Sequence, residues 1–397
     1  MNPRSSQFSA VSILLLVIFS SNCSQDSADL VETTIVDGVR LTRYMSYEPP
    51  AVNPYDVVAG PVYGQDQGID SYLFSSAVPV GVTKGGVVLI CDFREMQIHR
   101  FELSGMHLGT IGGRGQGPGE YLQLSPPAFD GNLLYIVDHA NARLTVLNAD
   151  GQVIVMTRLK GGEFPGSRFT VYGPPEKRGF IAVDVSTSRD PETMIPRYRH
   201  LHITLLDADL NLVSTPTDSV LDRPWTLLRG DLSLMVIPPF ENISAVVALK
   251  YNCPIAWSFG EAFRVDCLDP LTAERWAFQI PHEAAPVTDH MIEDNLSYWN
   301  SRGLLEVARR EIKYPKHLPH IQEMMWDDVR RLWVQEYKSP KDESGVYRFY
   351  VFSSAGERLF RQDLPVQPII VAEDVVYAQS EDESGNPVVT SFQLVRR

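Results

Sequence analysis

Three aspartates recur at a constant spacing along this chain. Asp92, Asp138 and Asp184 each close an apolar run, and 46 residues separate successive members. In a chain built from repeats of that length, the three carboxylates would gather near a common axis and could bind a cation such as Ca²⁺ through oxygen ligands. We favour the alternative that each carboxylate accepts hydrogen bonds from its own turn, because later parts of the chain hold no matching aspartate.

The glycine-rich segment 112–120 is the second group of residues that could bind a ligand. A phosphate-binding loop would end in Lys followed by Ser or Thr and would lead into a helix. Here Glu120 and Tyr121 follow instead, and a carboxylate would repel a phosphate. We therefore predict a tight connection in which the glycines permit positive φ. The alternative is a ligand-binding loop with Arg114, Gln116 and Glu120 as its polar contacts.

The four cysteines lack the Cys-x-x-Cys spacing of a zinc or redox site. Cys91 lies in an apolar run and is predicted to be a small buried side chain. Cys253 and Cys267 flank a predicted hairpin. They could pair as a disulfide in an oxidising compartment, if their geometry allows it.

The nine histidines form no recognisable catalytic or metal-binding pattern. His200 and His202 stand two residues apart in a predicted strand and would share one face of it. His317 and His320 lie in a loop bounded by prolines. Neither pair has a carboxylate at a spacing that would complete a zinc site, and no Gly-x-Ser-x-Gly segment marks a serine nucleophile. The sequence thus predicts no catalytic residue and no metal ligand, and it favours a protein that is not an enzyme.

The composition is that of a globular protein with an acidic surface. Of the 397 residues, 44% are hydrophobic, and the 28 Pro and 27 Gly are spread along the chain, which suits many short strands joined by turns. The formal net charge of −14 would repel phosphate backbones, so nucleic acid is not an expected partner.

The recurring aspartates belong to a longer repeat. Residues 87–92 align without gaps with residues 133–138, and a third copy begins at 180–184. Each copy is an apolar strand that ends in Asp. The second copy continues with an alternating strand at 144–147 and a turn at 148–151. A period near this length is typical of one four-stranded propeller blade.

Later repeats are less regular, and their strand patterns place them only approximately. We assign the fourth blade to 245–269, and we expect the fifth to begin near 332 and the sixth near 375. Strands at 37–44 and 73–82 are expected to complete the last blade, because ring closure removes the free edges that an open sheet would expose.

One segment departs from the strand pattern. Between Thr288 and Lys313 the apolar residues follow helical spacing, and Thr288 can cap the first turn. Pro315 and Pro319 end the pattern. We predict a short helical insertion at about 288–313, before blade five, whose Trp and Leu side chains pack against the fold.

Residues 1–22 are predicted to be a signal peptide. Arg4 supplies the positive charge, and the apolar stretch at 10–19 is too short to span a bilayer as a permanent helix. The polar residues that follow, up to residue 34, are expected to form a flexible tether.

The residues Ser20-Ser21-Asn22-Cys23 resemble a bacterial lipobox. The resemblance implies cleavage before Cys23 and lipidation of that cysteine, so that residues 23–34 become a lipidated tether. Ser24 follows the cysteine, which implies an outer-membrane address. The alternative is an ordinary secretory signal with an incidental cysteine.

The repeat unit resembles the bacterial six-bladed propeller lipoproteins related to NHL-repeat proteins. The glycine-rich segment 111–121 carries the resemblance most strongly, followed by 138–151 and by Leu318-Pro319-His320 with 331–334. The resemblance implies an all-β fold over residues 35–397, a six-bladed β-propeller of four-stranded antiparallel blades. It also implies a surface or periplasmic location and no assigned activity.

These patterns predict an exported, lipid-anchored binding or protein-interaction module at the cell envelope, facing the periplasm or held in the outer membrane. Its partner would be an envelope protein or a small ligand, and the membrane would be contacted through the lipid alone. The alternative is a metal-dependent propeller hydrolase or lyase that uses the central channel. No organic cofactor is expected.

Overall fold

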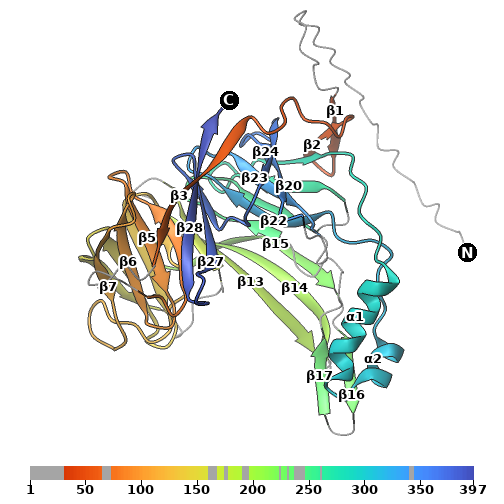
Figure 1. Cartoon of the computed structure of the whole chain (residues 1–397), viewed down its shortest axis with the longest axis horizontal. Helices are drawn as coiled ribbons and strands as arrows, with labels where there is room; N and C mark the ends of the chain where they lie inside the picture. The colour runs from red at the N-terminus through yellow and green to blue at the C-terminus, as the bar shows by residue number, and fades with distance from the viewer. Residues whose placement is uncertain are drawn as a thin grey trace, which may run out of the picture.

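The computed structural model shows six blades of four antiparallel strands around a common axis, so the expected six-bladed β-propeller is confirmed (Figure 1). The structure describes residues 31–64, 73–159, 168–173, 178–189, 196–222, 225–229, 232–236, 246–259, 262–338 and 344–397. The predicted signal peptide, Cys23 and most of the predicted tether lie outside these ranges.

The blades follow one another in chain order, and inner strands of neighbouring blades contact each other at most of the junctions around the axis. From the axis outward, the strands are β4 (Ala77–Val82), β5 (Val87–Asp92), β6 (Gln97–Glu102) and β7 (His107–Gly112) in blade I; β8 (Ala128–Phe129), β9 (Leu133–Asp138), β10 (Arg143–Asn148) and β11 (Val153–Arg158) in blade II; β12 (Arg168–Tyr172), β13 (Gly179–Arg189), β14 (Pro196–Leu206) and β15 (Leu212–Asp222) in blade III; β18 (Val246–Ala248), β19 (Ile255–Ser258), β20 (Arg264–Leu268) and β21 (Arg275–Gln279) in blade IV; β22 (Ile321–Trp326), β23 (Leu332–Glu336), β24 (Tyr347–Phe352) and β25 (Arg358–Leu364) in blade V; and β26 (Ile370–Ala372), β27 (Val375–Glu381), β28 (Pro387–Arg396) and β3 (Tyr55–Tyr63) in blade VI.

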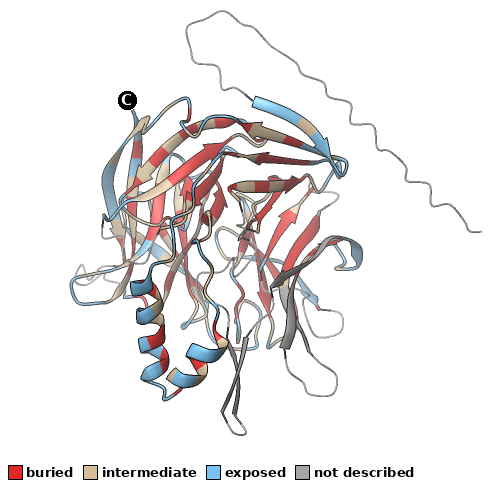
Figure 2. Cartoon of the chain, turned by 90° about the vertical axis from the view of Figure 1, so that its right-hand side faces the viewer, coloured by how far each residue is buried: buried red, intermediate tan, exposed pale blue. Residues whose placement is uncertain are grey.

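The hydrophobic core is divided among the junctions between blades. Six apolar clusters each join two neighbouring blades, including one that joins blade VI to blade I through Tyr377 and Val88. The second strand of a blade packs on both faces, so β5 and β9 are continuous apolar runs rather than alternating ones. Figure 2 shows the buried residues concentrated in the strands. Cys91 is fully buried in β5, as predicted.

Ring closure uses a different strand from the one the sequence predicts. The fourth strand of blade VI is β3, which pairs antiparallel with β28. The segment 37–44 does not complete that blade: β2 (Val39–Tyr44) forms a hairpin with β1 (Val31–Val36) and pairs in parallel with β21 of blade IV. The segment 77–82 is the inner strand β4 of blade I. Residues 31–34, assigned above to the tether, belong to β1.

The segment that precedes blade I runs along the outside of three blades, and we call residues 31–63 the N-terminal belt. Its hairpin extends blade IV, and the Tyr44 hydroxyl donates to the Gly356 carbonyl, at 2.7 Å. At blade V, Asn53 N–H donates to the Arg361 carbonyl and Arg361 N–H donates to the Ala51 carbonyl, at 2.7 and 2.9 Å. The belt then enters blade VI as β3, so it covers the outer edges of blades IV and V and completes blade VI.

The predicted helical insertion is present between blades IV and V. It contains α1 (Asp289–Asn300) and α2 (Leu305–Glu311), and the Thr288 side chain caps α1 by accepting from Met291 N–H. Leu296, Trp299 and Ala308 belong to a small apolar cluster of the insertion itself. In Figure 1 the helices lie beside the hairpin of β16 (Trp225–Arg229) and β17 (Leu232–Val236), and α2 contacts β16. Neither helix of the described ranges is long and apolar enough to cross a membrane.

Candidate functional site

Asp92 and Asp138 occupy the same position in blades I and II and make the same kind of contact. The Asp92 carboxylate accepts N–H bonds from Arg94 and Glu95 in its own turn and from Ser75 in the segment that enters the blade, at 3.0, 3.2 and 2.7 Å. The Asp138 carboxylate likewise accepts from its own turn and from the entering segment. These contacts match the turn-capping alternative that we favoured. A Ca²⁺ role for these aspartates stays a prediction.

Asp184 keeps the spacing but not the environment of the other two aspartates. It lies within β13, opposite His202 of β14, and β13 continues for several residues beyond it. The aspartate therefore does not close a strand, because the polar residues after it extend the ladder with β14. The imidazoles of His200 and His202 stack with ring centroids 6.0 Å apart, so the two side chains lie on one face, as predicted.

The glycine-rich loop is a folded connection between blades I and II. Arg143 of β10 donates to the Gln116 carbonyl at 2.9 Å and to the Glu120 carbonyl, and Asn141 donates to the Gly115 carbonyl at 3.1 Å. At Gly112, where φ is 90°, an added Cβ would lie 2.9 Å from the Met96 carbonyl oxygen. The loop therefore needs glycine for both conformation and close approach.

The three side chains proposed as ligand contacts in this loop have contacts of their own. The Glu120 carboxylate accepts from Gly117 N–H at 2.8 Å. Arg114 is exposed and donates to the Arg94 carbonyl at 3.0 Å, while Gln116 contributes its carbonyl to Arg143. The structure brings them together around the loop backbone, and their ligand-binding role stays a prediction.

The predicted disulfide between Cys253 and Cys267 is absent, and both residues are buried free thiols. The register of blade IV explains the difference, because Ala256 rather than Cys253 lies opposite Cys267. Cys267 belongs to the cluster between blades IV and V, and Cys253 lies in the turn between β18 and β19. Burial raises the pKa of the Cys253 thiol to about 12, so this thiol is protonated at neutral pH.

A histidine pair that the sequence did not reveal lies at the junction of blades IV and V. The Nδ1 atoms of His282 and His320 are 2.8 Å apart, and His282 Nε2 lies 3.2 Å from the Glu336 carboxylate. Burial, together with the neighbouring His282 and His317, lowers the pKa of His320 to about 4. The partner of His320 is thus His282, far along the chain, rather than His317.

The row of Glu336, His282 and His320 connects the two segments that flank the helical insertion to β23. Burial by itself would raise the pKa of Glu336, but the hydrogen bonds from His282 and Tyr47 and the charges of His282 and Arg348 together outweigh it and leave the pKa below its usual value. Within the described ranges, no group of three or more His, Cys, Asp or Glu residues is arranged to hold a metal ion. The metal-dependent hydrolase or lyase stays a prediction.

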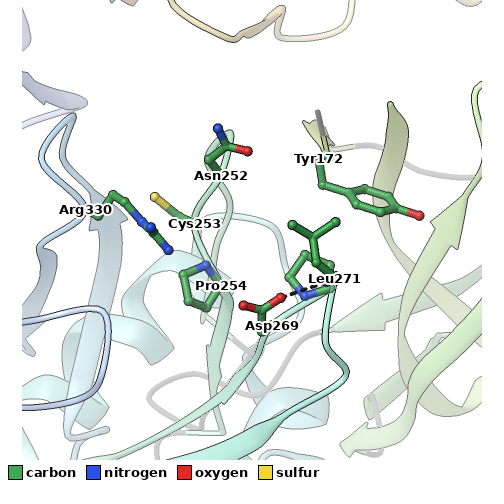
Figure 3. A pocket seen from close by; sticks show the side chains of 9 residues that line it. Tyr172, Asn252, Cys253, Pro254, Asp269, Leu271 and Arg330 are labelled. Atoms are coloured by element: carbon green, nitrogen blue, oxygen red, sulfur yellow. Dashed lines mark hydrogen bonds between the residues drawn. The ribbon is translucent and has the colours of Figure 1, made fainter. Parts of the chain in front are cut away.

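A pocket of about 250 Å³ opens among turns from blades III, IV and V. Its walls combine the Tyr172 side chain with Pro254 and Leu271, and its polar groups include Asn252 and Arg330 (Figure 3). Figure 3 shows the Asp269 carboxylate beside the turn of Leu271, where it accepts from Leu271 N–H at 2.7 Å. Neighbouring turns of a closed ring therefore form this pocket, which no single repeat contains.

Arg330 is the cationic side chain among the residues that line the pocket, and it stands on the side of blade V. Arg330 has a φ of 64° and is exposed, and its side chain hydrogen-bonds the Cys253 thiol. Lys250, in the same turn as Cys253, is partly buried. Burial lowers the pKa of its ammonium, and the nearby Cys253, Asp328 and Asp327 partly oppose that effect. Lys250 forms no ion pair among the described residues, so both cations keep hydrogen-bonding capacity.

The sequence does not predict this pocket, because most of its residues come from the least regular repeats. Asn252 and Arg330 belong to the turns after the inner strands of blades IV and V, at related blade positions. Positive φ at both positions, 56° and 64°, marks them as tight turns. Only the ring order of the blades brings these turns together.

Comparisons with known proteins support the fold. A family described as a 6-bladed beta-propeller matches residues 69–164. A DUF4221-family protein from Bacteroides vulgatus has a similar structure, with a TM-score of 0.50, 10% identity, and coverage of 87% of this chain and 99% of that chain. A Bacteroides fragilis protein proposed to be exported gives a TM-score of 0.49 at 14% identity, with coverage of 87% and 98%. No curated protein matches the sequence.

Proposed function

We propose that this chain is a binding module of the cell envelope, and that its ligand site is the pocket among the turns of blades III–V. The observation that carries the proposal is the exposed Arg330 guanidinium beside an apolar wall of Pro254, Leu271 and Tyr172. A few oriented polar groups over an apolar surface are typical of small-molecule sites. A rigid ring of blades also holds such turns in fixed positions.

The charges around the pocket favour a ligand that carries an anionic group. Arg330 supplies a planar set of donors that suits a carboxylate or phosphate, and the partly buried Lys250 adds positive charge nearby. The Asp269 carboxylate on the wall is engaged by backbone N–H groups at 2.7 and 3.1 Å. The ligand would therefore place its anionic group near Arg330 and its apolar part against Pro254 and Leu271.

A ligand screen tests this site. Small carboxylates, phosphate esters and sulfated sugars would be screened by thermal shift, and each hit would be titrated by calorimetry. We expect Arg330→Asn to weaken binding of a true ligand by roughly tenfold or more, because a charge-assisted hydrogen bond contributes about 1.5–3 kcal/mol. Asn tolerates the positive φ of this turn.

Arg396→Ala is the matched control for this screen, because Arg396 is an exposed arginine at the end of β28. Hits that bind wild type and Arg330→Asn equally would place the binding site elsewhere and contradict the proposal.

We further propose that the protein is exported and anchored through lipidated Cys23. The support is the sequence alone, which combines an apolar core at 10–19, a lipobox-like Ser20 to Cys23 and a polar stretch before the belt. Cys23→Ala should move the protein from the membrane fraction to the soluble fraction. Intact mass should show acyl chains on the wild type only. Wild-type protein that lacks acyl mass, or a variant that stays membrane-bound, would contradict lipidation at Cys23.

A further inference from the structure

Blade I brings two imidazoles and a hydroxyl together on its outer strands. His99 lies in β6, and His107 and Thr110 lie in β7. His99 Nδ1 lies 3.4 Å from His107 Nε2 and 3.1 Å from Thr110 Oγ1. The third separation, between Thr110 Oγ1 and His107 Nε2, is 3.5 Å. One nitrogen from each ring and the hydroxyl oxygen therefore form a nearly equilateral triangle.

A β-bulge creates this arrangement. His99 lies directly opposite Thr110, so these two side chains share one face of the sheet. His107 stands three positions before Thr110, and in a regular strand it would point to the other face. The register shifts so that Phe101 lies opposite His107, and Gly109 in the bulged segment has a φ of 136°. The bulge thus turns His107 onto the face of His99, which is how bulges commonly redirect a side chain.

The bulge is a feature of the repeat, whereas the three polar side chains are a feature of blade I. Blade II has the same register shift 46 residues further along the chain. There, Thr145, Val153 and Met156 take the places of the two histidines and the threonine. Because apolar side chains suit the same bulge, the blade does not need the polar set in order to fold. The set in blade I is therefore a candidate for a role of its own.

The triangle has the dimensions of one face of a tetrahedral metal site. Zinc binds histidine nitrogen at about 2.0–2.1 Å and oxygen at about 2.0–2.2 Å, so neighbouring ligand atoms lie about 3.3–3.5 Å apart. The ring centroids of His99 and His107 are 5.5 Å apart, well beyond the 3.4 Å between the two nitrogens, so these nitrogens face each other. Thr110 is exposed, so water can reach the fourth position.

The two imidazoles are in the form that binds a metal. His99 is fully buried, and burial together with the neighbouring His107 lowers its pKa to about 4. Burial lowers the pKa of His107 as well. Both rings are therefore neutral at neutral pH, and neutral imidazole binds zinc and copper rather than the harder calcium and magnesium. Without a metal, the Thr110 hydroxyl can hydrogen-bond both rings.

We propose that His99 Nδ1, His107 Nε2 and Thr110 Oγ1 bind one zinc ion, with water as the fourth ligand. The ion links β6 to β7, the outermost described strand of blade I. The site is independent of the pocket in blades III–V and of the central channel. With only two imidazoles and a hydroxyl, it binds zinc more weakly than a closed four-ligand structural site.

Calorimetry with zinc chloride tests the proposal on the full-length protein after treatment with a chelator. We expect one zinc ion per wild-type chain, and binding at least tenfold weaker in His107→Gln, because even a residue that only orients a ligand contributes about 10–100-fold in metal affinity. Thr110→Val, at an exposed position, should also weaken binding. Zinc should raise the thermal midpoint of the wild type and leave that of His107→Gln unchanged, since an ion that binds only the folded state stabilises it.

Two other histidine pairs supply matched controls. His202→Gln disrupts the stacked pair in β14, and His320→Gln disrupts the pair at the junction of blades IV and V. Both variants should bind zinc as the wild type does, and circular dichroism would confirm that every variant is folded.

Crystals soaked in zinc chloride locate the ion directly. Anomalous scattering at the zinc edge should show a peak within about 2.2 Å of both His99 Nδ1 and His107 Nε2. Zinc uptake by the wild type that is no greater than uptake by His107→Gln, or a peak at one of the other two histidine pairs alone, overturns the proposal.

Discussion

Arg143 contacts three groups at the junction between blades I and II, two carbonyls of the glycine-rich loop and one buried carboxylate. Its guanidinium donates to the Gln116 carbonyl at 2.9 Å and to the Glu120 carbonyl, and it lies 3.8 Å from the Asp138 carboxylate. The residue is 8% exposed, and the Asp138 side chain is fully buried. The arginine thus satisfies loop carbonyls and balances a buried negative charge at the same time.

Arg143→Met should therefore lower the free energy of unfolding by about 2–4 kcal/mol, because it leaves two carbonyls without their donor and a buried carboxylate without its cation. Chemical denaturation followed by tryptophan fluorescence measures the loss. The matched control is Arg114→Met in the same loop, where one exposed contact with the Arg94 carbonyl is lost and the change should stay within about 0.5 kcal/mol. Equal losses in the two variants would contradict a special role for Arg143.

At the residue scale, the sequence predicts roles that depend on local spacing. Asp92 and Asp138 were expected to cap their turns, and they do so. The role of Arg143 was not predicted, because the aligned position in blade I is Gln97 and the repeat gives it no special status. The contact between His320 and His282 was also not predicted, because only the fold brings these two residues together.

At the element scale, strands and helices with a clear local pattern were predicted well. β5 and β9 are the aligned apolar runs, and α1 begins after Thr288. The polar residues after Asp184 do not end the strand, because β13 and β14 pair through that segment, and a ladder satisfies backbone groups whatever the side chains. The local sequence pattern thus predicts which segments form strands more reliably than it predicts the residue at which each strand ends.

The hairpin of β1 and β2 shows what local pattern leaves open. Leu41 and Tyr44 are the buried residues of β2, and since they stand three positions apart in a strand they lie on opposite faces, which simple alternation does not predict. The sequence of β2 does not indicate β21 as its parallel partner, because any uncovered blade edge offers the same backbone groups. The choice depends on contacts made far along the chain, such as the hydrogen bond from the Tyr44 hydroxyl to the Gly356 carbonyl.

At the scale of the whole molecule, the propeller depends on closing the ring. Each of the six apolar clusters needs two blades, so an incomplete last blade exposes part of two clusters at once. β3 supplies Tyr63 to the cluster between blades VI and I and Val57 to the cluster between blades V and VI. The hairpin of β1 and β2 extends blade IV from outside and adds Tyr44 to the cluster between blades IV and V, but it supplies none of the four strands that close the ring at blade VI.

Two truncated chains distinguish the contribution of β3 from that of the hairpin of β1 and β2. A chain that begins at Glu48 lacks β1 and β2 and loses the burial of Leu41 and Tyr44. It should still unfold in one cooperative transition, with a free energy of unfolding lower by about 2–5 kcal/mol. A chain that begins at Gly64 also lacks β3, and it should show no cooperative thermal transition by circular dichroism and should aggregate, because blade VI then ends in the uncovered strand β28. A single cooperative transition in the shorter chain, at the midpoint of the longer one, would show that closure of the ring does not depend on β3.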